Sequence, residues 1–154
     1  MNKSKTVSSS QVVMTQLVLP SNTNALNTVF GGQVMAWIDI VAAIAAQRHA
    51  GSEVVTASID QLSFVAPIKL GWVANLKASV NFVSKTSMEI GVRVDAENPK
   101  TGEIFLTTSA YLTFVAVDAD GKPVPVPSLI LENDEQKRRF AAAQKRRELR
   151  LANR

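Results

Sequence analysis

The chain has 154 residues, of which 46% are hydrophobic and 19% are charged. This composition fits one globular domain and excludes a disordered protein. The sequence contains no cysteine and a single histidine, His49, so cysteine nucleophiles and thiolate metal sites are excluded, and any Ser-His-Asp or multi-histidine chemistry would depend on that one ring. The net charge of +4 lies entirely in residues 132–154. A basic tail of this kind could bind nucleic acid, an acidic membrane or a phosphorylated small molecule.

The first ten residues are polar and rich in serine, and they lack the apolar core of a secretory signal. We expect a disordered leader over residues 1–10, a folded domain over residues 11–131 and a basic helix over residues 132–154, in a cytoplasmic protein. The longest apolar stretch, residues 31–47, carries Asp39 at its centre. Because a carboxylate in lipid is costly, this stretch predicts a buried helix rather than a membrane span.

In chain order, residues 11–19 are rich in Val, Leu and Thr, which predicts a short strand that Pro20 ends. Residues 33–49 are rich in alanine and free of proline, which predicts a helix that stops before Gly51. The apolar residues of this helix fall on every face, as is typical of a helix wrapped by other structure.

After this helix the hydrophobic period changes to two, over residues 53–64, 72–83, 87–97 and 104–117. Short turns join these four predicted strands, so we expect antiparallel neighbours in a meander. Residues 132–150 follow as a charged amphipathic helix. The expected fold class is α+β, with a curved antiparallel sheet wrapped around one hydrophobic helix and a peripheral C-terminal helix. One face of the central helix would remain open, which favours a second copy closing over it.

Two features of the central helix are candidates for chemistry. Asp39 is the only ionisable residue in the apolar stretch; it could fix packing by accepting hydrogen bonds, or it could be a general base that activates water. Gly31 and Gly32 stand at the head of the helix; they could serve close packing against the sheet, or their N–H groups could hold a developing oxyanion. His49 is expected to be a helix C-terminal residue rather than a ligand.

Six parts of the chain form a series with a defined order and spacing. They are Asn22-Thr23-Asn24, then Val29-Phe30-Gly31-Gly32 with Trp37-Ile38-Asp39, Val55-Thr56-Ala57-Ser58-Ile59-Asp60 with Phe64, Thr86-Ser87-Met88-Glu89-Ile90, Phe114-Val115-Ala116-Val117 and Pro125-Val126-Pro127. Together they resemble the hot-dog-fold acyl-CoA thioesterases of the cytosolic type, which hydrolyse acyl-CoA to free fatty acid and CoA. The resemblance covers residues 14–150.

This resemblance implies a hot-dog fold and a homodimer with two composite sites, commonly assembled as a hexamer, a trimer of dimers. It implies that Asp39 is the catalytic base and that the N–H groups of Gly31 and Gly32 clamp the thioester carbonyl from the other subunit. Asn24 and Thr28 are expected in the same site, Thr28 where some relatives carry a polar partner to the acid. A covalent anhydride on Asp39 is an alternative to general-base catalysis. Neither a metal nor a cofactor is expected.

The resemblance also implies partners. The phosphates of CoA are expected to bind the turn formed by Ser84, Lys85, Thr86 and Ser87, and Arg138 of the basic helix, whose other interpretation is a solvated face. The alternative function is a non-catalytic acyl-CoA-binding module, a sensor, which needs the groove but not the acid; Asp39 favours the enzyme. Nucleic-acid binding would require aromatic residues among the basic ones or a DNA-reading helix, and the sequence has neither. We therefore expect an acyl-CoA substrate and neither a nucleic-acid nor a membrane partner.

Overall fold

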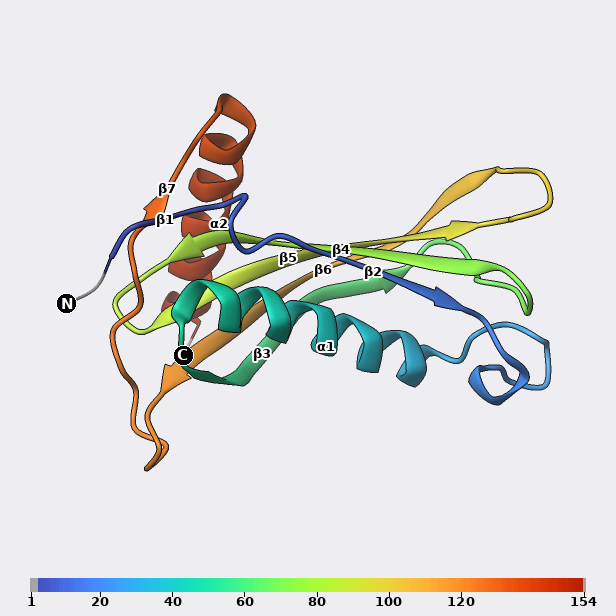
Figure 1. Cartoon of the computed structure of the whole chain (residues 1–154), viewed down its shortest axis with the longest axis horizontal. Coiled ribbons are helices and arrows are strands. Elements are labelled where there is room, and N and C mark those ends of the chain that lie inside the picture. The colour runs from blue at the N-terminus through green and yellow to red at the C-terminus, as the bar shows by residue number, and fades with distance from the viewer. Residues whose placement is uncertain (1–2, 154) are drawn as a thin grey trace.

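The computed structural model of the protein describes residues 3–153, apart from the side chain of Gln61. α1 lies along one face of a long sheet, and α2 packs on the other face near one end (Figure 1). The predicted α+β architecture, with a central and a peripheral helix, is confirmed. Within the described range the elements are, in order, β1 (Lys5–Thr6), β2 (Val12–Leu17), the 3-10 turn η1 (Pro20–Asn22), α1 (Gly31–Ala50), β3 (Glu53–Phe64), β4 (Val73–Val83), β5 (Ser87–Glu97), β6 (Ile104–Val117), β7 (Leu129–Ile130) and α2 (Asp134–Ala152).

Five of the strands form one antiparallel sheet in the order β2-β4-β5-β6-β3. The predicted meander is confirmed for β4, β5 and β6, but it is wrong for β3, which pairs with β6 and not with β4. Residues 65–72 therefore do not form a hairpin turn. They cross from the edge strand β3 to β4, which is separated from β3 by β5 and β6. Their backbone groups bond to the loop before α1: Val29 N donates to Ile68 O at 2.8 Å, and Leu70 N donates to Asn27 O at 2.9 Å.

One side of α1 packs against this sheet. Val41 and Ala45 are fully buried there, facing strand residues such as Leu76. Burying a Val or Leu side chain contributes about 1.5–3 kcal/mol, so this contact is the main core of the domain. The other side of α1 stays open, with Met35 40% and Ile40 52% exposed. A single chain thus wraps its central helix on one side only.

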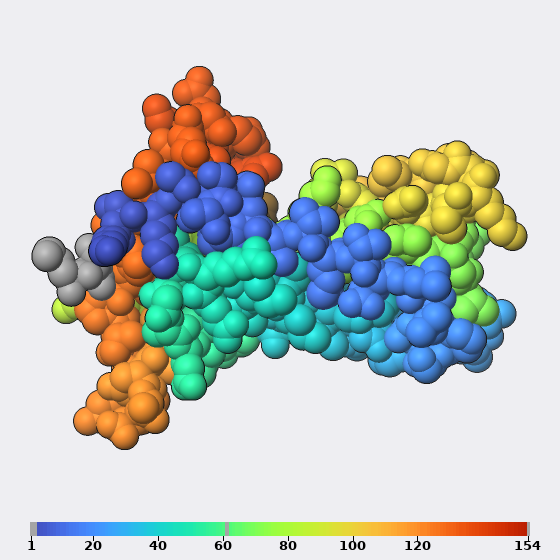
Figure 2. Space-filling model, in the orientation of Figure 1, coloured from blue at the N-terminus to red at the C-terminus, as the bar shows by residue number. Residues whose placement is uncertain are grey.

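The N-terminal segment is ordered where the structure describes it. β1 pairs in parallel with β7, and Val7 and Ser10 are buried. In Figure 2 this dark blue segment lies against the orange residues that lead into α2. The prediction of a disordered leader over residues 1–10 is therefore wrong for residues 3–10, because their backbone finds a partner strand far along the chain; residues 1 and 2 lie outside the described range.

α2 is fixed to the sheet by one side of its surface. Asn133 caps its start by accepting a hydrogen bond from Gln136 N at 2.9 Å. Arg146 reaches the sheet and donates two hydrogen bonds to the buried Glu89 of β5, at 2.9 and 2.8 Å. The Phe140 ring packs on Phe82 of β4 with ring centroids 4.8 Å apart. The predicted basic helix is confirmed, and its inner side is packed rather than solvated.

His49 ties the last turn of α1 to the segment before β7. The ring is fully buried, and its Nε2 lies 2.8 Å from the carbonyl oxygen of Pro127. Because a carbonyl can only accept, Nε2 carries the proton, and the neutral Nδ1 has no partner among the described residues. Burial lowers the pKa of His49, since the charged ring would lose its hydration.

This burial makes the stability of the fold depend on pH. The unfolded chain binds a proton at His49 more readily than the folded protein does. Protonation therefore favours the unfolded chain, and the free energy of unfolding falls as the pH drops through about 6.5. Between about pH 7.5 and about pH 5.5, urea titrations should show a larger fall in the free energy of unfolding for the wild type than for His49→Gln, which cannot titrate. An equal fall in the two proteins would contradict this role of the ring.

Candidate active site

Asp39 lies halfway along α1, beside the edge strand β3. The hydroxyl of Thr56 on β3 donates a hydrogen bond to Asp39 Oδ1 at 2.8 Å. The second carboxylate oxygen accepts no hydrogen bond from the described residues. In the single chain Asp39 is half-buried rather than enclosed, so the expectation of a buried acid is not met by one chain alone. The carboxylate is held in place on one oxygen and remains free to act through the other.

The start of α1 presents two free backbone donors. Phe30 is the N-cap and provides no side-chain hydrogen bond to the helix. Gln33 N donates back to Phe30 O at 3.0 Å, whereas the N–H groups of Gly31 and Gly32 have no partner in the described part of the chain. Both glycines are exposed. The start of the helix can therefore bind a negatively charged oxygen.

Packing does not require glycine at these two positions. An added Cβ would lie 3.5 Å from the Phe64 ring at Gly31 and 3.5 Å from the Phe30 ring at Gly32, which is ordinary contact distance, and neither glycine has a positive φ. Close packing against the sheet is thus not the reason for the glycine pair.

Asn24 and Thr28 organise the loop before the helix. Asn24 Oδ1 accepts hydrogen bonds from Leu26 N at 2.9 Å and from Thr28 N and Thr28 Oγ1 at 3.3 Å each. The loop also holds Asn27 at φ 59°, in the left-handed region. Within one chain, Thr28 therefore bonds to Asn24 and not to Asp39.

The helix separates the two chemical groups along its axis. Asp39 follows Gly31 by two turns, which at a rise of about 1.5 Å per residue places their backbones about 12 Å apart. One carbonyl cannot lie within about 3 Å of both the helix-start donors and the acid of the same chain. This separation suits a site in which the acid and the helix-start donors come from different chains.

The turn predicted to bind CoA lies far from the glycines in the same chain. Ser84 and Ser87 close this turn through their hydroxyls, 2.6 Å apart, and Lys85 O accepts from Val126 N at 2.9 Å. Val126 adjoins the carbonyl that His49 contacts, so the turn stands at the C-terminal end of α1 (Figure 1). Ser84, Lys85, Thr86 and Ser87 are thus brought together with one another but not with Gly31 and Gly32.

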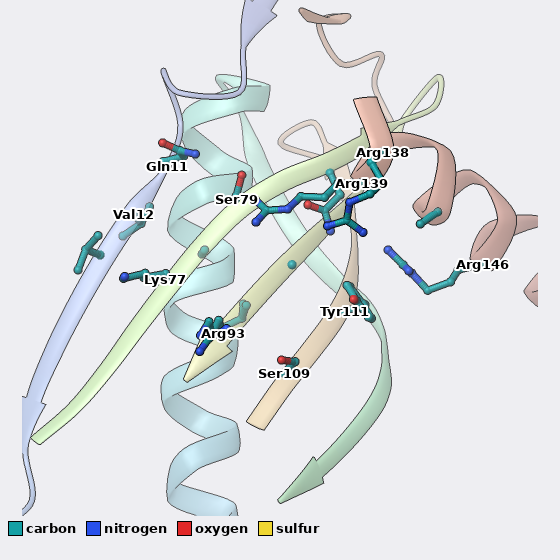
Figure 3. A pocket seen from close by; sticks show the side chains of 16 residues that line it. Gln11, Val12, Lys77, Ser79, Arg93, Ser109, Tyr111, Arg138, Arg139 and Arg146 are labelled. Carbon is teal, nitrogen blue, oxygen red and sulfur yellow. The ribbon is translucent and has the colours of Figure 1, made fainter. Parts of the chain in front are cut away.

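Arg138 lines a basic pocket on the sheet face opposite α1. The pocket has a volume of about 470 Å³. Arg138, Arg139 and Arg146 extend from α2 over the sheet, as Figure 3 shows, and Lys77 and Arg93 project from β4 and β5. Three carboxylates pair with the four arginines of this pocket, namely Asp95, Glu135 and Glu89. The pocket keeps a positive balance, and the sheet separates it from Asp39 of its own chain.

The residues 3–153 contain no group of three or more His, Asp or Glu side chains placed to hold a metal ion. Neither described helix is both long and apolar enough to cross a membrane.

Comparison with known proteins gives the family. A family model described as the thioesterase superfamily matches residues 26–103. The chain is 46% identical over 127 residues to a Bacillus subtilis protein named as an uncharacterized acyl-CoA thioester hydrolase, covering 82% of this chain and 74% of that protein. It is 39% identical to the cytosolic acyl coenzyme A thioester hydrolase of Mus musculus, over 88% of this chain and 36% of that longer protein.

Solved structures agree with the family model. An apo-hexameric acyl-CoA thioesterase is 46% identical with a TM-score of 0.94, over 98% of this chain and 97% of that one. An acyl-CoA hydrolase from Staphylococcus aureus, solved with butyryl coenzyme A, coenzyme A and coenzyme A disulfide, is 40% identical with a TM-score of 0.90, over 97% and 92% of the two chains. The chain therefore belongs to the thioesterase superfamily and has the hot-dog fold of its acyl-CoA thioester hydrolases.

Thr56 is a candidate site residue that the sequence did not single out. It belongs to a segment used for the resemblance, but a threonine in a strand looks the same whether it faces solvent or a helix acid. Only the packing of α1 beside β3 brings its hydroxyl to Asp39.

Proposed function

We propose that the protein hydrolyses acyl-CoA thioesters to the free acid and CoA. The observation that carries this function is the Asp39 carboxylate, held by Thr56 on the open side of α1 in a helix whose first two N–H groups are free. Three variants of the S. aureus acyl-CoA hydrolase support it, since they replace an aspartate, a threonine and an asparagine by alanine. The replaced positions have the same spacing as Asn24, Asp39 and Thr56 have in this chain.

The chemistry follows from these groups. Asp39 takes a proton from a water molecule as that water attacks the thioester carbonyl, and the N–H groups of Gly31 and Gly32 stabilise the oxyanion that forms. The C–S bond then breaks, and the proton passes to the departing thiolate of CoA. Thr56 keeps the carboxylate oriented, and Asn24 holds the loop that carries the glycines. Direct attack of Asp39 to form an anhydride would use the same groups.

The site is composite in this proposal, with Asp39 of one chain facing the glycines of another. The open side of α1 carries the exposed apolar residues Met35 and Ile40 and lies beside the edge strand β3, so an apolar surface is available for a second copy. Hexameric assembly of two structural relatives supports a trimer of dimers. A cytoplasmic location is supported by the mammalian relatives named cytosolic.

The CoA moiety is assigned to two places. The turn of Ser84, Lys85, Thr86 and Ser87 offers hydroxyls and a cation for phosphate groups. Arg138 faces away from the α1 side of its own chain, so it would contact the CoA of a substrate bound at a neighbouring subunit. A non-catalytic acyl-CoA sensor would use the same surfaces, but it would not need Asp39 and Thr56 in a hydrogen-bonded pair.

A panel of acyl-CoA thioesters, with release of free thiol as the readout, tests the function directly. The wild type should release thiol, and Asp39→Asn should lower kcat by about 10²–10⁴-fold, because the amide cannot accept the proton of water. Asp118→Asn, which changes an acid in an exposed turn, is the matched control and should keep wild-type activity. Near-normal kcat in a folded Asp39→Asn protein would refute the role of this acid, and binding without hydrolysis in the wild type would indicate the sensor.

The basic pocket predicts a separate effect on substrate binding. Replacing Arg138 and Arg139 by glutamine should raise KM about two- to tenfold at low salt with little change in kcat, because exposed ion pairs to phosphate act equally on the ground and transition states. The increase should shrink at high salt. Lys145→Gln, on the same helix but outside the pocket, is the control. A KM at low salt that matches the wild type would remove both arginines from the site.

A further inference from the structure

A second cavity, of about 330 Å³, lies beside Gly31 on the α1 side of the sheet. It is formed by the head of α1, the end of β3 and the crossover segment. Its walls are mostly apolar, and include Val29, Val34, Phe64, Val65, Pro67 and Ile68. Its volume is at the lower end of the roughly 300–1,000 Å³ that small-molecule sites occupy. An apolar cavity that begins at the carbonyl clamp is suited to an alkyl chain.

One polar side chain of the cavity lacks a partner. Thr107 lies at the register shift between β5 and β6, a β-bulge, and bulges redirect side chains. Thr107 is 2% exposed and lines the cavity, and its hydroxyl makes no hydrogen bond within the described residues. Buried polar groups of native proteins usually bond to water or ligand when protein partners are missing. The cavity therefore behaves as a place for solvent or ligand rather than a packing defect.

Phe64 forms the wall between this cavity and solvent. The residue is 47% exposed, and its ring atom Cε2 lies 3.5 Å from the position that a Cβ on Gly31 would occupy. The ring thus stands next to the backbone donors that are assigned to the thioester carbonyl. An acyl chain that enters beside Gly31 therefore runs along this ring, which closes the cavity on its solvent side.

We propose that this cavity receives the alkyl part of the acyl group and that Phe64 limits its length, so that the enzyme selects short and medium acyl chains. This inference rests on the proposed hydrolase function. Each methylene that enters an apolar cavity should raise kcat/KM about fourfold. Once the cavity is full, further methylenes meet the Phe64 wall, and kcat/KM should level off or fall. The chain length at which this break occurs is the property that Phe64 sets.

The test is kcat/KM for straight-chain acyl-CoA substrates from acetyl to palmitoyl. In Phe64→Ala the break should move to longer chains, and the ratio of kcat/KM for a chain beyond the wild-type break to that for butyryl-CoA should rise at least tenfold. Ala66→Leu, which fills the cavity from another wall, should move the break to shorter chains. Phe105→Ala is the matched control, because Phe105 is 41% exposed and stacks on Trp72 outside the cavity; its break should stay in place.

Ratios within one variant separate selectivity from a general loss of activity. If Phe64→Ala and Ala66→Leu change kcat/KM by the same factor for every chain length, the cavity does not hold the acyl group. Dissociation constants for the same acyl-CoA series, measured with Asp39→Asn and with the Asp39→Asn/Phe64→Ala pair, distinguish the two claims. If Phe64→Ala moves the break in the dissociation constants but the wild type hydrolyses no substrate, the cavity binds the acyl group and the proposed hydrolase function is wrong. If the wild type hydrolyses acyl-CoA but Phe64→Ala leaves the break at the same chain length, only the role of the cavity in acyl binding is wrong.

Discussion

The rise of α1 is the constraint on which the other features depend. The helix rises about 1.5 Å per residue, so it holds the backbone donors at Gly31 and the backbone of Asp39 about 12 Å apart. A hydrogen bond to a reacting carbonyl spans about 3 Å. In the proposed composite site, one chain therefore supplies the acid of one site and the donors of another. The sheet buries one side of the helix and leaves the other side apolar and open, so the surface proposed to bind a second copy is also the surface on which the two halves would meet.

The sheet divides the molecule into two working faces. On the α1 side lie the acid, the donors and the apolar cavity. On the opposite side the basic residues of α2 are held by the contact of Arg146 with the buried Glu89, which also accepts from Asn81. Gly91 makes this possible, because a Cβ there would lie 2.6 Å from Asn81 Nδ2. Losing one partner of a buried ion pair costs about 3–5 kcal/mol, so α2 presents its charges from a fixed position.

Much of the fold could be predicted from local pattern, because alternation along a strand records which side faces the core. The bounds of β3, β5 and β6 match the period-two runs, and α1 matches its alanine-rich stretch. Pairing across the chain could not be predicted in the same way. A turn with Pro67 suits a hairpin or a crossover equally, and two polar residues such as Lys5 and Thr6 give no sign of a distant partner strand. Asp39 stood out as a charge among apolar residues, whereas Thr56 became visible only through its contact with that acid.

Subunit complementation tests the composite site most directly. Gly31→Pro removes one donor N–H at the first helical position, where proline is favoured and where Phe30 already has φ −72° and ψ 149°. This variant and Asp39→Asn should each be nearly inactive alone. When they are co-expressed, half of a random set of dimers contains one chain of each kind, and one of its two sites has both groups intact, so activity should return to about a quarter of the wild-type value. Activity that stays at the level of the separate variants, in mixed assemblies of wild-type mass, would show that each site is built from one chain.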